Sequence, residues 1–131
     1  KREHFQPLAP VLLEEDFKKY FSINKSIVKN LEWMGTLCDA KEELYDKYSS
    51  IIHVDGTCRT QISKDEHSLT YKILKNLKKS GSDILVNTSF NISKDPVVFD
   101  LYDVYVNMKR MNINFVIMDD GLYQTKNIWE K

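Results

Sequence analysis

The chain has 131 residues, enough for one domain with a buried core. Lysine plus arginine and aspartate plus glutamate each number 19, and this zero net charge argues against general binding to nucleic acid or to an anionic membrane. Cys38 and Cys58 lie in apolar stretches without the spacing of a redox or metal motif, so we expect two reduced, buried thiols in a cytoplasmic protein. No segment has the length and apolarity of a membrane span, and no signal peptide is predicted.

The first third of the chain predicts an extended segment, a helix and a strand. Residues 5–13 are apolar and contain two prolines, which favours an extended segment or an edge strand. Residues 14–21 predict a short helix whose apolar face is Phe17, Tyr20 and Phe21. Residues 33–38 are a strand candidate.

The middle of the chain alternates helices and strands. Residues 41–48 predict a helix with Leu44, Tyr45 and Tyr48 as its buried face, and residues 51–55 predict a strand that ends at Gly56. Residues 66–79 predict an amphipathic helix with lysines on its outer face and Gly81 as its C-cap. The apolar run 84–86 is typical of a strand that is covered on both faces.

The last third predicts a helix and a hairpin. Residues 100–111 have a second amphipathic pattern, and residues 114–118 and 122–124 flank an Asp-Asp-Gly turn. Alternating strands and helices followed by a hairpin predict an α/β (α+β) fold with a twisted mixed sheet flanked by helices. We expect residues 1–131 to form a single domain that belongs to a longer protein, because the chain starts with Lys1 and enters an apolar segment at once.

Two polar clusters in the first half of the chain are candidate anion sites. The basic pair Lys1-Arg2 is one, although such a pair is more often solvated surface. In residues 53–61 the alternation of an extended chain places five polar side chains on one side: His53, Asp55, Thr57, Arg59 and Gln61. The guanidinium of Arg59 suits a carboxylate or a phosphate, but an exposed edge strand whose arginine pairs with a nearby acid fits the pattern equally well.

A third polar cluster, residues 87–91, directly follows the predicted strand 84–86. Its sequence is Asn-Thr-Ser-Phe-Asn, and strand ends in α/β sheets are where ligands bind. Amides and hydroxyls beside free backbone N–H groups can form a neutral cradle for an anion. The same residue types are ordinary turn residues, so the pattern also fits a plain loop.

The order of three motifs resembles one enzyme family. KREHFQPLAP at residues 1–10, HVDGTCRTQ at 53–61 and NTSFNISKDPVV at 87–98 are similar to the carboxy-terminal domain of carbamoyltransferases of the nodulation-protein and cephem/tobramycin type. WMGTLCDAK at 33–41 also resembles a family segment. That domain has the fold of the YrdC-type enzymes, whose lysine-arginine and threonine-serine-alanine-asparagine motifs are similar to residues 1–2 and 88–91.

The resemblance implies the first half-reaction of an O-carbamoyltransferase, which forms carbamoyl-adenylate from carbamoyl phosphate and ATP. A preceding transferase domain, missing from this chain, would bind iron or a similar metal and pass the carbamoyl group to a hydroxyl acceptor. Magnesium would arrive with ATP, without a protein cage of its own. Carbamoyl phosphate, ATP and that missing domain are the expected partners, and nucleic acid and membranes are not.

The resemblance also implies roles for individual residues. The residues expected to act in catalysis are Lys1, Arg59 and Ser89, and those expected to bind the nucleotide are Arg2, His53, Thr57, Asn87, Thr88 and Asn91. The alternative is a module that binds a nucleotide or carbamoyl phosphate without independent catalysis, and a purely structural second domain is the remaining possibility. The carbamoyl acceptor cannot be read from these residues.

Overall fold

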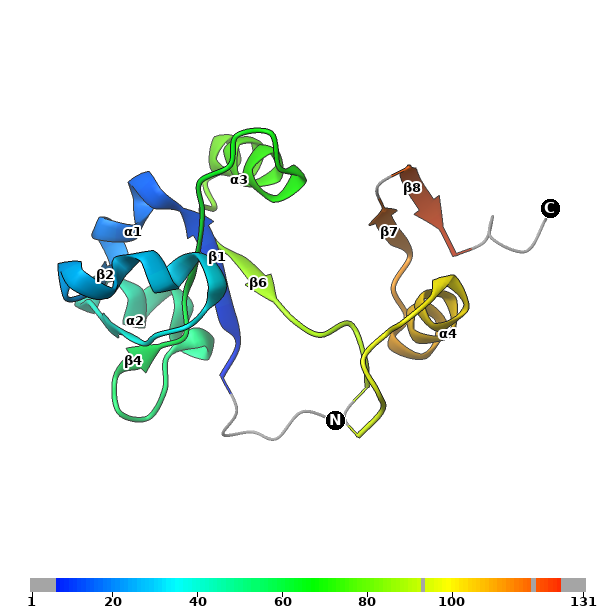
Figure 1. Ribbon diagram of the computed structural model, residues 1–131, viewed down its shortest axis with the longest axis horizontal. Helices are drawn as coiled ribbons and strands as arrows, with labels where there is room; N and C mark the ends of the chain where they lie inside the picture. Colours follow the sequence, from blue (N-terminus) through cyan, green and yellow to red (C-terminus); the bar gives the residue numbers. More distant parts are fainter. Residues whose placement is uncertain (1–6, 93, 119, 126–131) are drawn as a thin grey trace. The chain divides into compact units, whose positions relative to one another are not determined.

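A computed structural model describes residues 7–92, 94–118 and 120–125 (Figure 1). The fold is a mixture of helices and small sheets, which confirms the predicted α/β class. The chain divides into two compact units, one within Glu3–Thr88 and the other within Ser89–Lys131. Each is described by itself.

A mixed sheet forms the centre of the Glu3–Thr88 unit. Strand β1 (Ala9–Leu13) lies in the middle, parallel to β5 (Gln61–Ser63) and antiparallel to β6 (Leu85–Asn87). The edge position predicted for residues 5–13 is therefore wrong. Pro10 is tolerated in a central strand because the ladder to β5 begins only at the next residue, Val11.

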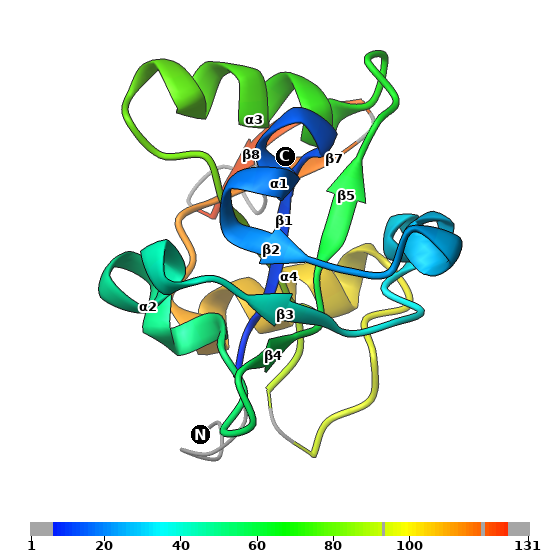
Figure 2. The same ribbon diagram turned by 90° about the vertical axis from the view of Figure 1, so that its left-hand side faces the viewer.

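The second sheet is antiparallel, in the order β2 (Phe21–Ser22), β3 (Cys38–Ala40) and β4 (Thr57–Cys58). In Figure 2 this sheet lies in front of β1 and β5, between α1 and the turn that leads into β4. Its strands come later in the chain than the sequence predicted. Both predictions, a strand at residues 33–38 and another at 51–55, are wrong.

In both places a 3-10 helix ends at the first residue of the predicted strand, and a turn follows it. The 3-10 helix η1 (Lys25–Trp33) begins at Asn24, whose side chain accepts a hydrogen bond from the backbone N–H of Ser26, and ends at Met34 in the left-handed conformation (φ 52°). A second 3-10 helix, η2 (Ser49–Ile51), leads into a turn closed by Gly56 at φ 82°. A side-chain cap at η1 and the left-handed Gly56 after η2 therefore outweigh the apolar strand pattern.

The three predicted α-helices of this unit are present. They are α1 (Glu14–Tyr20), α2 (Glu42–Tyr48) and α3 (Leu69–Lys79). Helix α3 starts later than expected because Ser68 caps it by accepting from the N–H of Tyr71, and Gly81 follows the C-cap at φ 84°. Tyr45, assigned to the buried face of α2, is instead 47% exposed.

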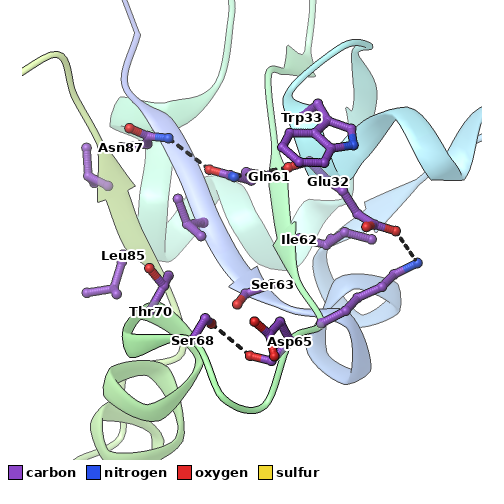
Figure 3. A pocket seen from close by; sticks show the side chains of 13 residues that line it. Glu32, Trp33, Gln61, Ile62, Ser63, Asp65, Ser68, Thr70, Leu85 and Asn87 are labelled. Carbon is purple, nitrogen blue, oxygen red and sulfur yellow. Dashed lines mark hydrogen bonds and ion pairs between the residues drawn. The ribbon is translucent and has the colours of Figure 1, made fainter. Parts of the chain in front are cut away.

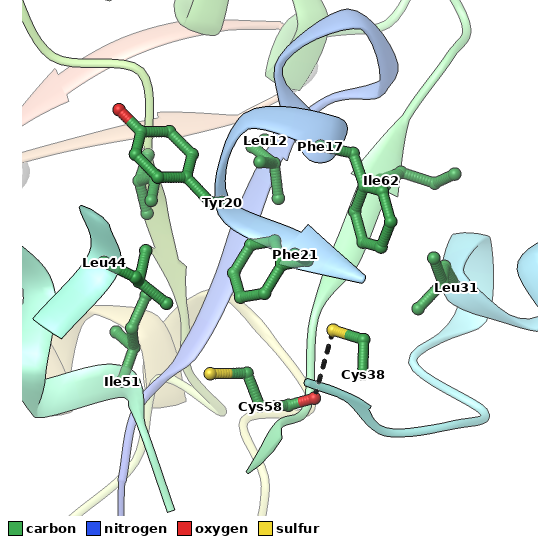
Figure 4. Close-up of a cluster of buried hydrophobic side chains, with 11 residues drawn as sticks. Leu12, Phe17, Tyr20, Phe21, Leu31, Cys38, Leu44, Ile51, Cys58 and Ile62 are labelled. Carbon is green, nitrogen blue, oxygen red and sulfur yellow. Dashed lines mark hydrogen bonds between the residues drawn. The ribbon is translucent and has the colours of Figure 1, made fainter. Parts of the chain in front are cut away.

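The main core lies between the two sheets and helices α1 and α2, as Figure 4 shows. Its fully buried members include Leu12, Leu31, Leu44 and Cys58. Helix α3 covers the opposite face of β1, where Val11 and Leu13 pack against Leu74. Strand β6 lies at the edge of the sheet. Val86 is 44% exposed, so the prediction that residues 84–86 are covered on both faces is wrong.

A buried carboxylate joins α1, α2 and the start of β6. Asp83 accepts hydrogen bonds from the hydroxyl of Tyr20 at 2.7 and 2.9 Å, from the hydroxyl of Tyr48 at 3.2 Å, and from Nζ of Lys19 at 3.1 Å. Burial raises the pKa of Asp83, but the hydrogen bonds from Tyr20 and Lys19 outweigh burial and hold it below its ordinary value. The ionised form of Asp83 therefore stabilises this unit.

The Ser89–Lys131 unit contains helix α4 (Leu101–Met111) and the hairpin of β7 (Phe115–Met118) and β8 (Gly121–Gln124). Both elements were predicted. Asp100 caps α4 by accepting from the N–H of Asp103, and Asn112 ends the helix in the left-handed conformation at φ 56°.

Candidate functional site

Arg59 is exposed on the stretch between β4 and β5, and its orientation is set by a backbone carbonyl. Its Nε donates to the carbonyl oxygen of Met34 at 3.3 Å, at the turn that ends η1. Among the residues that the structure describes, Arg59 forms no ion pair. The alternative in which this arginine pairs with a neighbouring acid is thus not seen among the described residues.

Gln61 and Asn87 are joined by a hydrogen bond across the mixed sheet, as Figure 3 shows. Gln61 Nε2 donates to the carbonyl of Glu32 at 3.0 Å, and Asn87 Nδ2 donates to Gln61 Oε1 at 2.8 Å. A second contact of Asn87 Nδ2, at 3.5 Å, is with the sulfur of Met34. The end of η1 therefore positions all three polar side chains.

His53 and Thr57 face each other across the turn that precedes β4. The Thr57 hydroxyl donates to Oδ1 of Asp55 at 2.8 Å, and Nδ1 of His53 lies 2.9 Å from the same hydroxyl. Because a hydroxyl has one hydrogen and it goes to the carboxylate, neutral His53 must carry its proton on Nδ1. Nε2 is then left as an acceptor. The structure thus brings His53, Asp55 and Thr57 together, although by a turn rather than by a continuous strand.

The segment after β6 uses many of its polar groups internally. The Ser89 hydroxyl donates to Oδ1 of Asn91, and Asn91 Nδ2 donates to the carbonyl of Asp95 at 2.7 Å. Phe90, between them, is left-handed at φ 52°. Asp95 is also paired with Arg110 at 2.5 Å. These contacts hold Ser89 and Asn91 together in one turn, within the Ser89–Lys131 unit.

The remaining predicted site residues are Thr88, Lys1 and Arg2. Thr88 is exposed at the end of β6. Lys1 and Arg2 lie outside the described residues. The predicted site residues therefore appear as two described groups, one on the Glu3–Thr88 unit and one in the Ser89–Asn91 turn, which directly follows it in the chain.

Sequence reasoning missed the positioning role of the turn at Glu32, Trp33 and Met34, because residues 33–38 were taken for a strand. The signals that could have found it are the capping residue Asn24 and Gly35, whose hypothetical Cβ would approach the carbonyl oxygen of Asn30 to 3.3 Å. These signals are local, whereas the contacts of the turn with Arg59 and Gln61 join residues 25 and 29 positions apart.

The two cysteines face each other in the register of β3 and β4, and both are free thiols. Burial raises the pKa of Cys38 to about 11 and that of Cys58 to about 12. Cys38 donates to the hydroxyl oxygen of Thr60 at 3.1 Å. They are free, buried core residues, as predicted.

The described residues contain neither a cluster of metal ligands nor a membrane-spanning helix. They contain no group of three or more histidine, cysteine, aspartate or glutamate side chains that could hold a metal ion. Within 7–92, 94–118 and 120–125, no helix is long and apolar enough to cross a membrane.

Comparison with protein families gives one match, to the family described as "Carbamoyltransferase C-terminus", over residues 1–125. Nodulation protein NolO of Bradyrhizobium diazoefficiens is 30% identical over 128 residues, and nodulation protein NolNO of Sinorhizobium fredii is 27% identical over 128 residues. Nodulation protein U of Rhizobium tropici is 34% identical over 93 residues.

The matches cover most of this chain but a small part of each relative. NolO and NolNO are each matched over 96% of this chain, and nodulation protein U over 70%. The matched segments make up 23%, 19% and 16% of NolO, NolNO and nodulation protein U, respectively. The relatives are thus several times longer than this chain.

Proposed function

We propose that this chain, which belongs to the family of carbamoyltransferase C-terminal domains, forms carbamoyl-adenylate. This is the first half-reaction of an O-carbamoyltransferase. Carbamoyl phosphate is hydrolysed to carbamate and phosphate. A carbamate oxygen then attacks the α-phosphorus of ATP, the bond to the β-phosphate oxygen breaks, and pyrophosphate leaves. Each turnover consumes one water, one carbamoyl phosphate and one ATP.

The observation that carries the proposal is the unpaired guanidinium of Arg59. Its Nε is held by the carbonyl of Met34, which leaves the N–H groups of both terminal nitrogens available to a ligand. Carbamate and ATP are both anions, so their approach requires a cation that no protein carboxylate already neutralises. An arginine that is fixed at one nitrogen and free at the other two meets this requirement.

The remaining roles follow from the motifs. Lys1 and Arg2 neutralise phosphate oxygens. Asn91, whose amide nitrogen keeps a second hydrogen beyond its bond to Asp95, donates to the phosphoryl group, and Ser89 positions Asn91 through its hydroxyl. Thr57, Thr88 and His53 support the bound nucleotide. Carbamate is itself a nucleophile, so none of these residues has to act as a general base. Magnesium accompanies the ATP phosphates and adds charge neutralisation.

The relatives' greater length supports an accompanying amino-terminal domain. We propose that this domain binds iron or a similar metal and carries out the second half-reaction, in which a hydroxyl acceptor attacks the carbamoyl carbon and AMP leaves. The acceptor is then chosen by that domain and not by the residues described here.

Pyrophosphate release from ATP, measured with and without carbamoyl phosphate, tests the proposal. We expect release that requires both substrates, and we expect Arg59→Ala to lower it at least 100-fold because the charge on the transferring group is no longer neutralised. Ser89→Ala is expected to lower it about tenfold. The matched control is Lys79→Ala, which removes an exposed cation on α3 and should leave the rate unchanged.

Two outcomes would contradict the proposal. Binding of ATP and carbamoyl phosphate without pyrophosphate release assigns the chain to a binding module instead. Equal rates for Arg59→Ala and Lys79→Ala would remove Arg59 from the reaction. Thermal unfolding of each variant separates loss of activity from loss of folding, because an exposed arginine should contribute little to stability.

A further inference from the structure

The loop that follows β6 contains two non-glycine residues in the left-handed conformation, Phe90 at φ 52° and Lys94 at φ 76°. A Cβ atom makes this conformation unfavourable, so the surrounding contacts must hold it. Asn91 and Asp95 directly follow these two residues in the chain, and both have bonded side chains. The conformation of the loop therefore depends on the contacts of Asn91 and Asp95.

Both ends of the Asn91 amide are held by neighbours in this loop. Its Oδ1 accepts from the hydroxyl of Ser89, and its Nδ2 donates to the backbone carbonyl of Asp95 at 2.7 Å. A carbonyl can only accept, so the amide nitrogen must be the group that faces Asp95. The nitrogen carries a second hydrogen, which has no acceptor among the described residues. Because the amide is planar, the direction of this second N–H follows from the other two contacts.

Asp95 is in turn fastened to helix α4. Its backbone N–H donates to the carbonyl of Ile92 at 2.9 Å, and its carboxylate pairs with Nη1 of Arg110 at 2.5 Å. Arg110 lies in the last turn of α4, next to the turn that contains the buried Met108. A chain of contacts thus runs from the helix, through the carboxylate and the carbonyl of one residue, to the amide of Asn91.

The ion pair is too exposed to be a major source of stability. The side chains of Asp95 and Arg110 are 31% and 49% exposed, and pairs at such positions contribute little to the free energy of unfolding. Its contacts instead reach a residue of the predicted site, because the same Asp95 whose carboxylate is paired supplies the carbonyl that binds Asn91. We therefore expect the pair to affect the position of the loop more than the stability of the fold.

From these observations we propose that Asp95 and Arg110 are positioning residues of the reaction, which hold Asn91 so that its second amide N–H is presented to the phosphoryl group. The inference deepens the proposed function and rests on it. Neither residue touches the substrate, because a carboxylate repels phosphate and this one already neutralises the charge of Arg110. Release of the loop would move the Asn91 donor, and a displacement of about 1 Å can lower a rate up to about 100-fold.

Steady-state pyrophosphate release by the whole chain tests the inference. We expect Arg110→Ala and Asp95→Ala each to lower kcat about tenfold and to leave KM for both substrates within about twofold, because the weakened bond is one that the transition state makes most strongly. Arg110→Lys keeps a cation for Asp95 and should recover most of the rate. The matched control is Lys109→Ala, which removes the neighbouring cation of the same helical turn, over the ring of Tyr105, and should leave the rate unchanged.

A double-mutant cycle shows whether Arg110 acts through Asn91. In the Asn91→Ala background, Arg110→Ala should cause no further loss, because the group that Arg110 positions is already absent. A second loss of about tenfold there would overturn the inference, since Arg110 would then act on the substrate or through another residue. NMR provides a readout without turnover: solvent exchange of the Asn91 Nδ2 protons should become faster in Arg110→Ala and stay unchanged in Lys109→Ala.

The outcomes separate this inference from the proposed function. Without pyrophosphate release in the wild type the function is overturned, and the exchange of the Asn91 amide decides whether Arg110 positions it: faster exchange in Arg110→Ala supports this, and unchanged exchange contradicts it. Pyrophosphate release at equal rates in Arg110→Ala and Lys109→Ala overturns the inference alone. If Arg110→Ala fails to fold, Asp95→Ala replaces it in the cycle, because it removes the same pair and keeps the carbonyl that binds Asn91.

Discussion

Arg59 and Gln61 owe their orientation to backbone carbonyls at the end of η1, and Gln61 in turn orients Asn87. A carbonyl can only accept, so it determines which end of an amide or which nitrogen of a guanidinium faces it. These side chains are therefore oriented before any ligand binds, which lowers the entropic cost of binding. Met34, left-handed at φ 52°, ends η1 beside the carbonyls of Glu32 and Met34 that accept these hydrogen bonds.

At the residue scale, the contacts of Asp83 predict how the free energy of unfolding changes with pH. Asp83→Asn should lower the free energy of unfolding by about 3 kcal/mol at pH 7, because it replaces a buried acceptor of three side chains. The folded pKa of Asp83 lies below its ordinary 3.8, so its stabilising effect is complete above that pH and is lost as the pH falls further. Urea unfolding of wild type and variant from pH 7 to pH 3 measures both.

The control for Asp83 is Asp46→Asn, which changes an exposed carboxylate of α2. It should lower stability by less than about 0.5 kcal/mol. A constant difference between wild type and Asp83→Asn at every pH would show that the ionised form of Asp83 is not what stabilises the fold.

The two thiols provide a second test at the residue scale. With pKa values of about 11 and 12, Cys38 and Cys58 carry about one thiolate in a thousand or fewer at pH 8. Both side chains are also buried. We expect iodoacetamide to leave the native chain unlabelled over an hour and to label both cysteines in urea, as measured by mass spectrometry. Rapid labelling of native Cys58 would contradict the packing of β4.

At the scale of elements, the sequence predicted helices better than strands. Helices α1, α2, α3 and α4 have apolar faces at helical spacing, and each lies close to its predicted range. Helices α3 and α4 also have side-chain N-caps. The strands are two to five residues long, too short for an alternating pattern to define them. Their pairing also joins residues far apart in sequence, as in β1 with β6, and such contacts cannot be read locally.

The cap of α4 tests whether local signals determine an element in the Ser89–Lys131 unit. Asp100→Ala should lower the stability of the helix by about 1 kcal/mol, because the N–H of Asp103 loses its acceptor. Asp100→Asn keeps a side-chain acceptor and should lower the stability of the helix by only a few tenths of about 1 kcal/mol. Hydrogen exchange of the α4 amides measures the effect on this helix directly. Equal protection in Asp100→Ala and wild type would show that packing, and not the cap, determines where α4 begins.

At the scale of the whole molecule, the fold class and family could be read from the sequence, but the arrangement of the site could not. The motifs at 53–61 and 87–98 pointed to Arg59 and Asn87. No local pattern indicated that Asn87 would donate to Gln61, since this depends on a carbonyl in η1. The roles proposed for Lys1 and Arg2, outside the described residues, remain predictions.

The central claim is adenylate formation, and the products of a single mixture test it most directly. Phosphorus NMR of the chain with ATP, magnesium and carbamoyl phosphate should show phosphate and pyrophosphate appearing in equal amounts, together with one new α-phosphorus signal for carbamoyl-adenylate or the AMP formed from it. Arg59→Ala should suppress the pyrophosphate and the new signal. Formation of ADP, or of pyrophosphate at the same rate without carbamoyl phosphate, would contradict the claim.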